Sequence, residues 1–517
     1  MTVQARIEPA ALDALLAPYD TTNAPGFAVG VALQGKPVYR RGVGMASIEL
    51  PVTLSPTIRM RIGSTSKHFC VLAVMLLAEE GRLSIDDSVR RHLPELPAWA
   101  DTMTVRQLMA HTSGMRDSLD LLLHAAGPGI ATASDFQFRM LAALDSVNFA
   151  AGTSWSYNNG GYVLLAEIVT RLGGQDFASF LRERIFTPVG MHDTLVRALD
   201  TDLVPNSATL HVPSPNGGYM RGVFGSPIGG EGGIVSTIND MLLWLKHMSA
   251  PVVGSEATWA AMRTPHATHG YGLGLTMNQH RGLDTVHHAG AVVGGSSQML
   301  KVLGHELDII IISNGRSSLE LYKLVDDIID RCIPGLPPLP GDAEGVPVEG
   351  DYYNPDTGRK LTLVAHEGRQ AIRLGGMALP AKCAGDGWLS LPIVPTDMRL
   401  RPIDGGASLD VTEFGQREIL TRVAPAQGQD AAPILGDYGS AAAGISAIIA
   451  GSGEEVPRLI LRNAIGSFIY NLTPVATDLW EARGAGPLPL AATLEFDDRG
   501  FRLTTGRTLR LRFERHK

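Results

Sequence analysis

Ser64 and Lys67 stand three residues apart in the stretch RIGSTSK, which covers positions 61–67. An uninterrupted apolar run from Phe69 to Ala78 follows, and it predicts a buried helix that starts close to Ser64. Residues three apart on a helix share a face, so the hydroxyl and the amine are expected within hydrogen-bonding reach. Burial and the positive end of a helix dipole lower the pKa of a lysine, which lets it act as a base. The pair therefore predicts a serine nucleophile with Lys67 as its base, and the N–H of Ser64 as an oxyanion donor.

A second polar stretch, Trp155 to Gly161, reads WSYNNGG and is rich in turn-forming residues. It is interpreted as a loop that leads into a helix starting near Tyr162. Tyr157 and Asn159 lie two residues apart and can point the same way. Tyr157 is predicted to shuttle protons beside Ser64, and Asn159 to bind the substrate amide. A plain turn is the alternative interpretation of this stretch on its own.

A third stretch, VHHAGAVVGGS from Val286 to Ser296, is typical of a strand edge. A substrate backbone could pair with such an edge, and the N–H of Ala291 could complete the oxyanion hole. His288 is predicted to give electrostatic or proton-transfer help. Adjacent histidines on a strand face opposite sides, and no carboxylate or cysteine cluster accompanies them, so a metal site is not expected.

Ser-x-x-Lys alone carries little weight, because a chain of 517 residues contains about one match by chance. With Tyr-x-Asn and His-x-Gly in the same order, the chain resembles the penicillin-recognising serine hydrolases. That group includes class C β-lactamases, D-alanyl-D-alanine carboxypeptidases and related esterases. Further stretches resemble the family over about residues 10 to 330: LMAHTSG at 108–114, PVGM at 188–191, GGIVST at 232–237 and YGLGL at 271–275. The resemblance implies an α+β catalytic domain with an antiparallel sheet flanked by helices, no cofactor, and a structural role for His111.

The sequence pattern changes toward the carboxyl-terminal part of the chain. A Pro/Gly-rich segment at 337–342 predicts a boundary near residue 340, and short strand-like stretches follow it. A small, polar segment at 424–430 predicts a second boundary. Gly-Asp-Tyr recurs at Gly350 and Gly436, and each copy is followed by Asp-x-Trp, at Asp386 and Asp478. The predicted domains are a catalytic domain at 1–340 and two antiparallel β-barrels at 341–425 and 426–517. Coincidence of short tripeptides is the alternative explanation of the repeat.

His288 stands where many β-lactamases and peptidoglycan enzymes have lysine, so the resemblance points to the D-aminopeptidase and esterase branches. A catalytic domain followed by two barrels resembles the three-domain bacterial D-aminopeptidases, in which a loop of the last barrel reaches the active site. The matching loop implies that Asp478 pairs with the free ammonium of a substrate; a turn residue is the alternative. Thr276 and Ser296 depart from the D-aminopeptidase pattern, which has Asn and Arg there, and this puts the amine pocket in doubt.

The composition excludes several other classes. The formal net charge is −8 with scattered basic residues, so nucleic acid is not an expected partner. The three cysteines lie far apart, which favours reduced thiols over disulfides or zinc. The amino terminus lacks the pattern of an export signal and no membrane-length apolar segment follows, so a soluble cytoplasmic protein is expected, subject to an export signal having been removed. The barrels offer enough surface for a homodimer.

The leading hypothesis is an enzyme that forms an acyl-enzyme on Ser64. Its expected substrates are short peptides or amides with a D-amino acid or glycine at the amino terminus. Two alternatives stay open: an esterase or β-lactamase-like hydrolase of similar mechanism, and a non-catalytic ligand-binding or sensor protein that has kept the fold.

Overall fold

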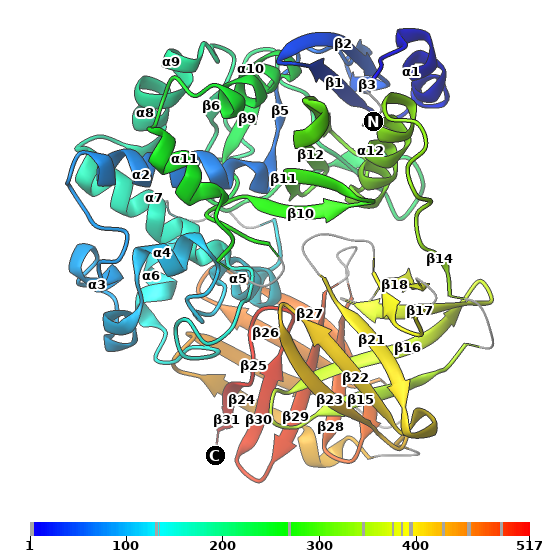
Figure 1. Ribbon diagram of the computed structural model, residues 1–517. Coiled ribbons are helices and arrows are strands. Elements are labelled where there is room, and N and C mark those ends of the chain that lie inside the picture. Colours follow the sequence, from blue (N-terminus) through cyan, green and yellow to red (C-terminus); the bar gives the residue numbers. More distant parts are fainter. Residues whose placement is uncertain are drawn as a thin grey trace. The chain divides into compact units, whose positions relative to one another are not determined.

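The computed structural model is shown in Figure 1. It describes residues 5–129, 133, 135–266, 270–343, 347–374, 377–383, 386–391, 397–426, 430–451, 456–485 and 490–516. The chain divides into two compact units. Unit 1 comprises Met1–Leu93, Met103–Ala110 and Gly161–Pro338, and unit 2 comprises Pro94–Thr102, His111–Gly160 and Leu339–Lys517. Each unit is described by itself.

A six-stranded antiparallel sheet forms the centre of unit 1, in the order β10-β11-β12-β13-β1-β2. Every neighbouring pair runs antiparallel. Short turns join all of these pairs except β1 with β13, which are distant in the chain. The strands are β1 (Phe27–Leu33), β2 (Lys36–Val43), β10 (Thr276–His280), β11 (Leu283–Val292), β12 (Gly295–Val302) and β13 (Leu307–Ser313).

Helices cover both faces of this sheet. Val29 and Val31 of β1 and Ile309 of β13 pack with α1 (Pro9–Leu16) and α12 (Ser318–Cys332) in one core. The alternate residues of β1 face α10 (Ile238–Ser249). A Cβ at Gly30 would lie 2.6 Å from the side chain of Ile238, so glycine permits the close approach of this helix.

The predicted buried helix is α2 (Lys67–Glu79), and a 3₁₀ turn (Gly63–Ser66) leads into it. Residues from Phe69 to Leu77 are buried, and Gly81 follows the helix with a φ of +70°. The other helices of unit 1 are α3 (Val89–His92), α4 (Val105–Met109), α8 (Phe177–Leu181), α9 (Thr187–Val189) and α11 (Glu256–Arg263), with a π-helical turn at Arg182–Phe186 and 3₁₀ turns at Ala17–Tyr19 and Leu303–His305. Its short strands are β3 (Met45–Ser47), β4 (Val52–Thr53), β5 (Met60–Arg61), β6 (Leu195–Val196), β7 (His211–Pro213), β8 (Tyr219–Arg221) and β9 (Ile234–Ser236). Helix α7 (Asn159–Gly173) contributes its first two residues to unit 2 and the rest to unit 1.

Unit 2 contains two antiparallel β structures. The first is a ten-stranded sheet around one core, with β14 and β18 as its end strands. Strand β19, which pairs with β14, follows β18 in the chain after Ala381 alone. The second is a closed eight-stranded barrel of β24 to β31. The strands are β14 (Gly341–Asp342), β15 (Gly350–Asn354), β16 (Arg359–His366), β17 (Arg369–Leu374), β18 (Met377–Pro380), β19 (Lys382–Cys383), β20 (Leu389–Ser390), β21 (Arg399–Ile403), β22 (Ser408–Glu413), β23 (Gln416–Arg422), β24 (Gly436–Ser440), β25 (Ile445–Ala450), β26 (Arg458–Asn463), β27 (Gly466–Ala476), β28 (Leu479–Gly484), β29 (Ala491–Asp497), β30 (Gly500–Thr504) and β31 (Leu511–Arg515).

The two copies of Gly-Asp-Tyr occupy equivalent places in the two β structures. Tyr352 of β15 and Tyr438 of β24 are both buried, and each phenol donates to a backbone carbonyl. The strand that carries each tyrosine pairs with the last strand, in chain order, of its own sheet: β15 with β23 through Tyr352 and Arg422, and β24 with β31 through Tyr438 and Arg515. The Asp-x-Trp copies differ, since Trp480 is buried in β28 whereas Trp388 is half-buried before β20. The repeat in the sequence therefore marks equivalent strands of two antiparallel β structures, the ten-stranded sheet (the first barrel) and the closed eight-stranded barrel (the second barrel).

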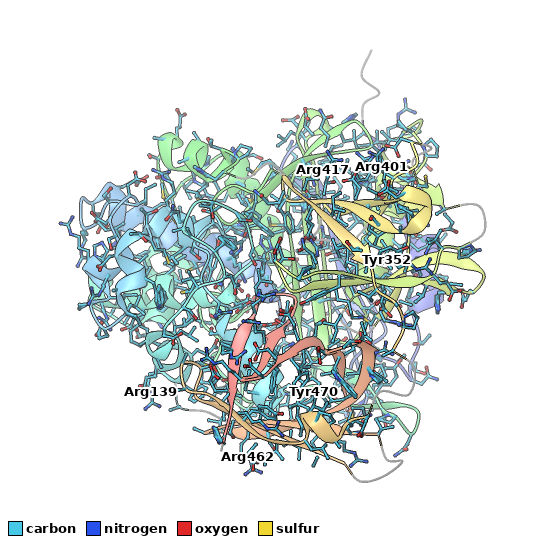
Figure 2. The ribbon with its side chains drawn as sticks, turned by 90° about the horizontal axis from the view of Figure 1, so that it is seen from below. Arg139, Tyr352, Arg401, Arg417, Arg462 and Tyr470 are labelled. Atoms are coloured by element: carbon cyan, nitrogen blue, oxygen red, sulfur yellow. The ribbon has the colours of Figure 1, made fainter. Side chains whose placement is uncertain are left out.

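A helical part of unit 2 packs on the second barrel. It consists of α5 (Ser118–Ala126) and α6 (Phe136–Ala143), with a 3₁₀ turn at Ala98–Thr102. Tyr470 of β27 lies among the barrel strands in Figure 2, and its phenol lies 2.9 Å from Nδ1 of His124 and 2.8 Å from the carbonyl of the same residue. Arg401 and Arg417, labelled in the same view, both bind Asp410 in the first barrel.

The predicted fold class is confirmed: a β-lactamase-like α+β domain is followed by antiparallel barrel sheets. The boundary near residue 340 lies close to the division between Pro338 and Leu339. Unit 2 also takes His111–Gly160 from within the predicted first domain, a segment that the sequence pattern assigned to the catalytic part. Of the predicted second boundary, residues 427–429 lie outside the described residues.

Candidate active site

Ser64 and Lys67 are in contact in unit 1. The Nζ atom of Lys67 donates to Oγ of Ser64 at 3.1 Å and to the carbonyl oxygen of Glu231 at 2.7 Å. Lys67 is completely buried, whereas Ser64 is partly exposed within an otherwise buried stretch. The 3₁₀ turn at Gly63–Ser66 continues into α2 and thus puts the two side chains on one face. The hydroxyl is reachable from outside while its basic partner is not.

The backbone of Gly63 lies directly against Ala291 of β11. A Cβ on Gly63 would be only 2.7 Å from the amide nitrogen of Ala291, and the φ of Gly63 is +51°. Glycine is therefore required at this position on both counts. The contact brings the amide of Ala291 next to the turn that carries Ser64, which suits a pair of oxyanion donors.

The third predicted stretch lies on β11, which is paired on both sides for part of its length. Strand β10 pairs with it as far as Thr276 opposite His287, and β12 pairs with it from Thr285 to Val292. Among the described residues, the segment from His288 onward has strand pairing on the β12 side only. The predicted edge is thus limited to the residues that follow His287.

His288 is buried and points its ring at Tyr271. Its Nδ1 lies 2.6 Å from the carbonyl of Ala289, and its Nε2 lies 3.2 Å from the Tyr271 phenol. A carbonyl can only accept, so Nδ1 carries the proton and Nε2 accepts from Tyr271. Burial, and then the nearby positive charge of Lys67, lowers the pKa of His288 to about 3. His288 is neutral near pH 7, so it acts as a neutral hydrogen-bonding group and not as a cation.

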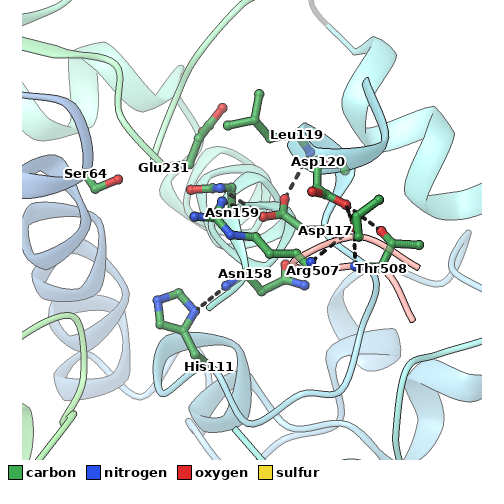
Figure 3. Close-up of polar contacts among 12 residues, drawn as sticks. Ser64, His111, Asp117, Leu119, Asp120, Asn158, Asn159, Glu231, Arg507 and Thr508 are labelled. Atoms are coloured by element: carbon green, nitrogen blue, oxygen red, sulfur yellow. Dashed lines mark hydrogen bonds and ion pairs between the residues drawn. The ribbon is translucent and has the colours of Figure 1, made fainter. Parts of the chain in front are cut away.

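Tyr157 lies in unit 2, in a turn anchored by His111. The backbone N–H of Asn158 donates to Nδ1 of His111 at 3.1 Å (Figure 3). The ring centroids of His111 and Tyr157 are 4.3 Å apart. His111 is buried with a φ of +61°, which fits its predicted structural role. The side-chain amide of Asn158 donates to the carbonyl of Met115 and closes the turn.

Asn159 begins α7, so the helix starts three residues earlier than the sequence pattern indicated. Its side-chain amide donates to Asp117 at 3.0 Å. Asp117 is fully buried and also accepts from the backbone N–H of Leu119 and from Nη1 of Arg507 at 3.2 Å (Figure 3). The carboxylate thereby orients Asn159 and holds an arginine from the second barrel.

Arg507 lies between β30 and β31, with its guanidinium 5.0 Å from the ring centroid of Tyr157. Neighbouring contacts fix this loop. The hydroxyls of Thr505 and Thr508 donate to Asp120, and the carbonyl of Arg507 accepts from Asn148. The positive charge therefore sits on the face of the predicted proton shuttle.

Asp478 occupies a different end of the same barrel. It is an exposed turn residue between β27 and β28 with a φ of +60°. Its neighbours Val475 and Leu479 pack on Tyr353 of the first barrel. Among the described residues of unit 2, the loop that contacts Tyr157 carries Arg507 and not Asp478. The role predicted for Asp478 stays a prediction without a contact to support it.

The structure thus brings Ser64, Lys67, His288 and Ala291 together in unit 1, and Tyr157 with Asn159 in unit 2. Sequence reasoning missed Asp117 and Arg507, which are 390 positions apart and match no short motif. It also missed the carbonyl of Glu231, although this residue directly precedes the recognised stretch at 232–237.

Among the residues that the structure describes, there is neither a metal-binding cluster nor a membrane-spanning helix. No group of three or more His, Cys, Asp or Glu side chains is arranged to hold a metal ion. No described helix is long and apolar enough to cross a membrane. All three cysteines, Cys70, Cys332 and Cys383, are free.

Comparison with known proteins gives consistent matches. The family model described as Beta-lactamase matches residues 12–329. A D-aminopeptidase of Brucella canis is 29% identical over 364 residues, which are 68% of this chain and 68% of that protein. A penicillin-binding protein homologue from Pyrococcus abyssi, solved as an octamer, superposes with a TM-score of 0.57 at 18% identity and covers 90% of this chain and 100% of its own. The D-amino acid amidase of Ochrobactrum anthropi SV3, complexed with L-phenylalanine amide, has a TM-score of 0.53 at 23% identity, with 62% and 96% covered.

Proposed function

Since the chain belongs to the Beta-lactamase family and is a serine hydrolase, we propose that it releases a D-amino acid or glycine from the amino terminus of short peptides or amides. One observation carries the proposal: the buried Nζ of Lys67 lies 3.1 Å from Oγ of the partly exposed Ser64. The names of the D-aminopeptidase and D-amino acid amidase relatives support the substrate class.

Acylation begins with attack of the Ser64 oxygen on the substrate carbonyl carbon. Lys67 acts as the base in its deprotonated form: the hydroxyl proton passes to its amine, the C–O bond forms, and negative charge moves onto the carbonyl oxygen. The amides of Ser64 and Ala291 donate to that oxygen. The close contact between Gly63 and Ala291 supports this pairing of donors.

Collapse of the tetrahedral intermediate breaks the bond between carbonyl carbon and nitrogen. Tyr157 relays the proton from Lys67 to the departing amine, which leaves neutral. Asn159 donates its side-chain amide to the substrate, in an orientation set by Asp117. Water then attacks the ester on Ser64, with the same groups taking its proton and returning it to the serine.

His288 assists in its neutral form. Tyr271 already donates to Nε2, so the pair extends a chain of hydrogen bonds beside Lys67 without adding a second positive charge. A second cation there would oppose transient protonation of Lys67 in the acylation step. The pKa of about 3 supports this role over that of a general acid.

A substrate panel tests the proposal. D- and L-alanine p-nitroanilides, glycine p-nitroanilide, p-nitrophenyl acetate and a chromogenic cephalosporin are assayed with the wild type and with Ser64→Ala. The proposal predicts turnover of the D-alanine and glycine anilides, more than 10-fold faster than the L-isomer and lost in the variant. Turnover of the ester or the cephalosporin alone would instead favour an esterase or a β-lactamase-like enzyme. No turnover and no serine labelling would favour the ligand-binding alternative.

A further inference from the structure

A cavity of about 930 Å³ lies within unit 2, and both Tyr157 and Arg507 line it. Its other walls come from both barrels and from the segment that precedes α7. Arg116 and Asn148 lie on the wall from that segment, and Phe414 lies on the wall from the first barrel. The predicted proton shuttle therefore faces a space large enough for part of a small substrate.

Only part of the Arg507 guanidinium is used by the protein. Nη1 donates to Asp117, while Nε and Nη2 have no acceptor among the described residues. The side chain of Arg507 is 34% exposed, although its loop is packed against Asp120 and Asn148. Nη1 fixes this planar fork of donors to Asp117, while Nε and Nη2 stay open. The two open donors are suited to binding a carboxylate through two parallel hydrogen bonds.

The carboxylates nearest to this fork, Asp117 and Asp120, are both engaged by protein groups, which leaves the open donors of the fork to an anion. Asp117 is buried, and its oxygens are already engaged by Asn159, Leu119 and Arg507, so it has no exposed surface for a substrate ammonium. Arg116 adds a second buried guanidinium to the same cavity, where burial lowers its pKa to about 10 and leaves it charged at neutral pH. Its Nη1 donates to the carbonyl of Leu509 and to Asn148.

We propose that Arg507 forms a carboxylate subsite for the leaving group, so that the enzyme prefers peptides with a free carboxyl terminus over their amides. This inference rests on the proposed function. There, Tyr157 protonates the departing nitrogen, and in a dipeptide the terminal carboxylate is separated from that nitrogen by one Cα atom. A leaving group held at the Tyr157 hydroxyl therefore presents its carboxylate within reach of a guanidinium lying on the same ring.

A purely structural role for Arg507 predicts a different outcome. If the guanidinium only ties its loop to Asp117, its removal affects all substrates alike, through misplacement of Tyr157 and Asn159. The two roles are separated by comparing substrates that differ only in the terminal carboxylate.

The experiment measures kcat/KM for D-alanyl-glycine and D-alanyl-glycinamide from the release of D-alanine. The wild type, Arg507→Met, Arg507→Lys and Arg502→Met are compared. Arg502 is a matched control, because it lies on β30, pairs with Glu495 and Asp497, and does not line the cavity. Circular dichroism checks that each variant is folded, and Arg507→Lys keeps the charge beside Asp117.

The expected result is a wild-type preference of about 10- to 100-fold for the free acid. Arg507→Met abolishes the preference, because loss of the contact with Asp117 slows both substrates and loss of the subsite slows the free acid about 10- to 100-fold more. Arg507→Lys keeps part of the preference, and Arg502→Met leaves it unchanged. Hydrolysis of both peptides with no wild-type preference, or a preference that survives in Arg507→Met, overturns the carboxylate subsite alone. Failure of the wild type to hydrolyse either peptide overturns the proposed function and this inference together.

Discussion

The two groups of predicted catalytic residues are held in different ways. Ser64 and Lys67 are positioned by one 3₁₀ turn and the helix that continues it, so their geometry follows from covalent neighbours. Tyr157 and Asn159 depend on Asp117 and Arg507, which are 390 positions apart in the chain and meet because the second barrel packs on the helical segment. The proposed nucleophile is therefore positioned by local structure, and the proposed proton shuttle is positioned by tertiary contacts.

The largest loss of activity is expected from substitutions of Ser64 and Lys67. Ser64→Ala removes the nucleophile, and Lys67→Met removes its base without changing the length of the side chain much. We expect kcat/KM for D-alanine p-nitroanilide to fall about 10⁴-fold or more for either variant. Steady-state assays measure the loss. Residual activity above a few per cent in Ser64→Ala would show that another residue is the nucleophile.

Tyr157→Phe probes the residues that tertiary contacts hold in place, and it is expected to lower kcat about 10²- to 10³-fold. The ring stays under Arg507, so only the proton relay is lost. Tyr219→Phe, on an exposed strand of unit 1, is the control and should keep full activity. An unchanged kcat in Tyr157→Phe would remove the phenol from the mechanism.

The free energy of unfolding is expected to fall on mild acidification, mainly through buried histidines in unit 1, the unit that contains Ser64. Burial lowers the pKa of His287 to about 4 and that of His288 to about 3, from 6.5. Both imidazoles are neutral when folded and bind protons below pH 6.5 once unfolded, so their stabilising effect is full above that pH and is lost toward the folded values. By pH 5.5 each lowers the free energy of unfolding by about 1.4 kcal/mol.

Urea unfolding between pH 7.5 and pH 5.5 measures this slope. His287→Gln should flatten it, whereas the matched replacement of a half-exposed histidine, His305→Gln, should leave it unchanged. An equal slope in all three proteins would mean that His287 does not contribute to the acid response.

Asp117→Asn is expected to have the smallest effect, and it tests the contacts that hold Asn159 and Arg507. The substitution keeps the shape of the side chain but removes the charge that holds Arg507 and Asn159. We expect about a 10-fold loss of kcat/KM and about 1–2 kcal/mol of unfolding free energy, since the guanidinium remains partly solvated. Asp135→Asn, whose exposed carboxylate pairs with Arg139, is the control. Equal behaviour of the two variants would argue against a positioning role for Asp117.

The same contrast explains what could be predicted from sequence. The helix after Ser64 was predictable because its apolar run and following glycine are local signals, and the barrels because Gly-Asp-Tyr recurs. The start of α7 was placed too late, because its first residues, Asn159 and Gly160, are turn formers that tertiary contacts hold in a helix. Arg507 was missed because nothing near it in the sequence shows that its loop packs on Tyr157.

The choice of Asp478 shows the same limit. The tripeptide Asp-x-Trp marks a real strand, β28, but the position of its loop in the barrel depends on strand order and not on the tripeptide. A loop at the end of a barrel can be recognised from sequence, whereas the neighbour that it contacts cannot.

Covalent trapping is the most direct test of the central claim that Ser64 is activated by Lys67. The wild type and Lys67→Met are incubated with a serine-reactive phosphonate, and the modified peptide is identified by mass spectrometry. The account predicts one label, on Ser64, formed in the wild type and slowed at least about 100-fold in Lys67→Met. A label on another residue, or equal labelling of Ser64 in both proteins, would contradict it.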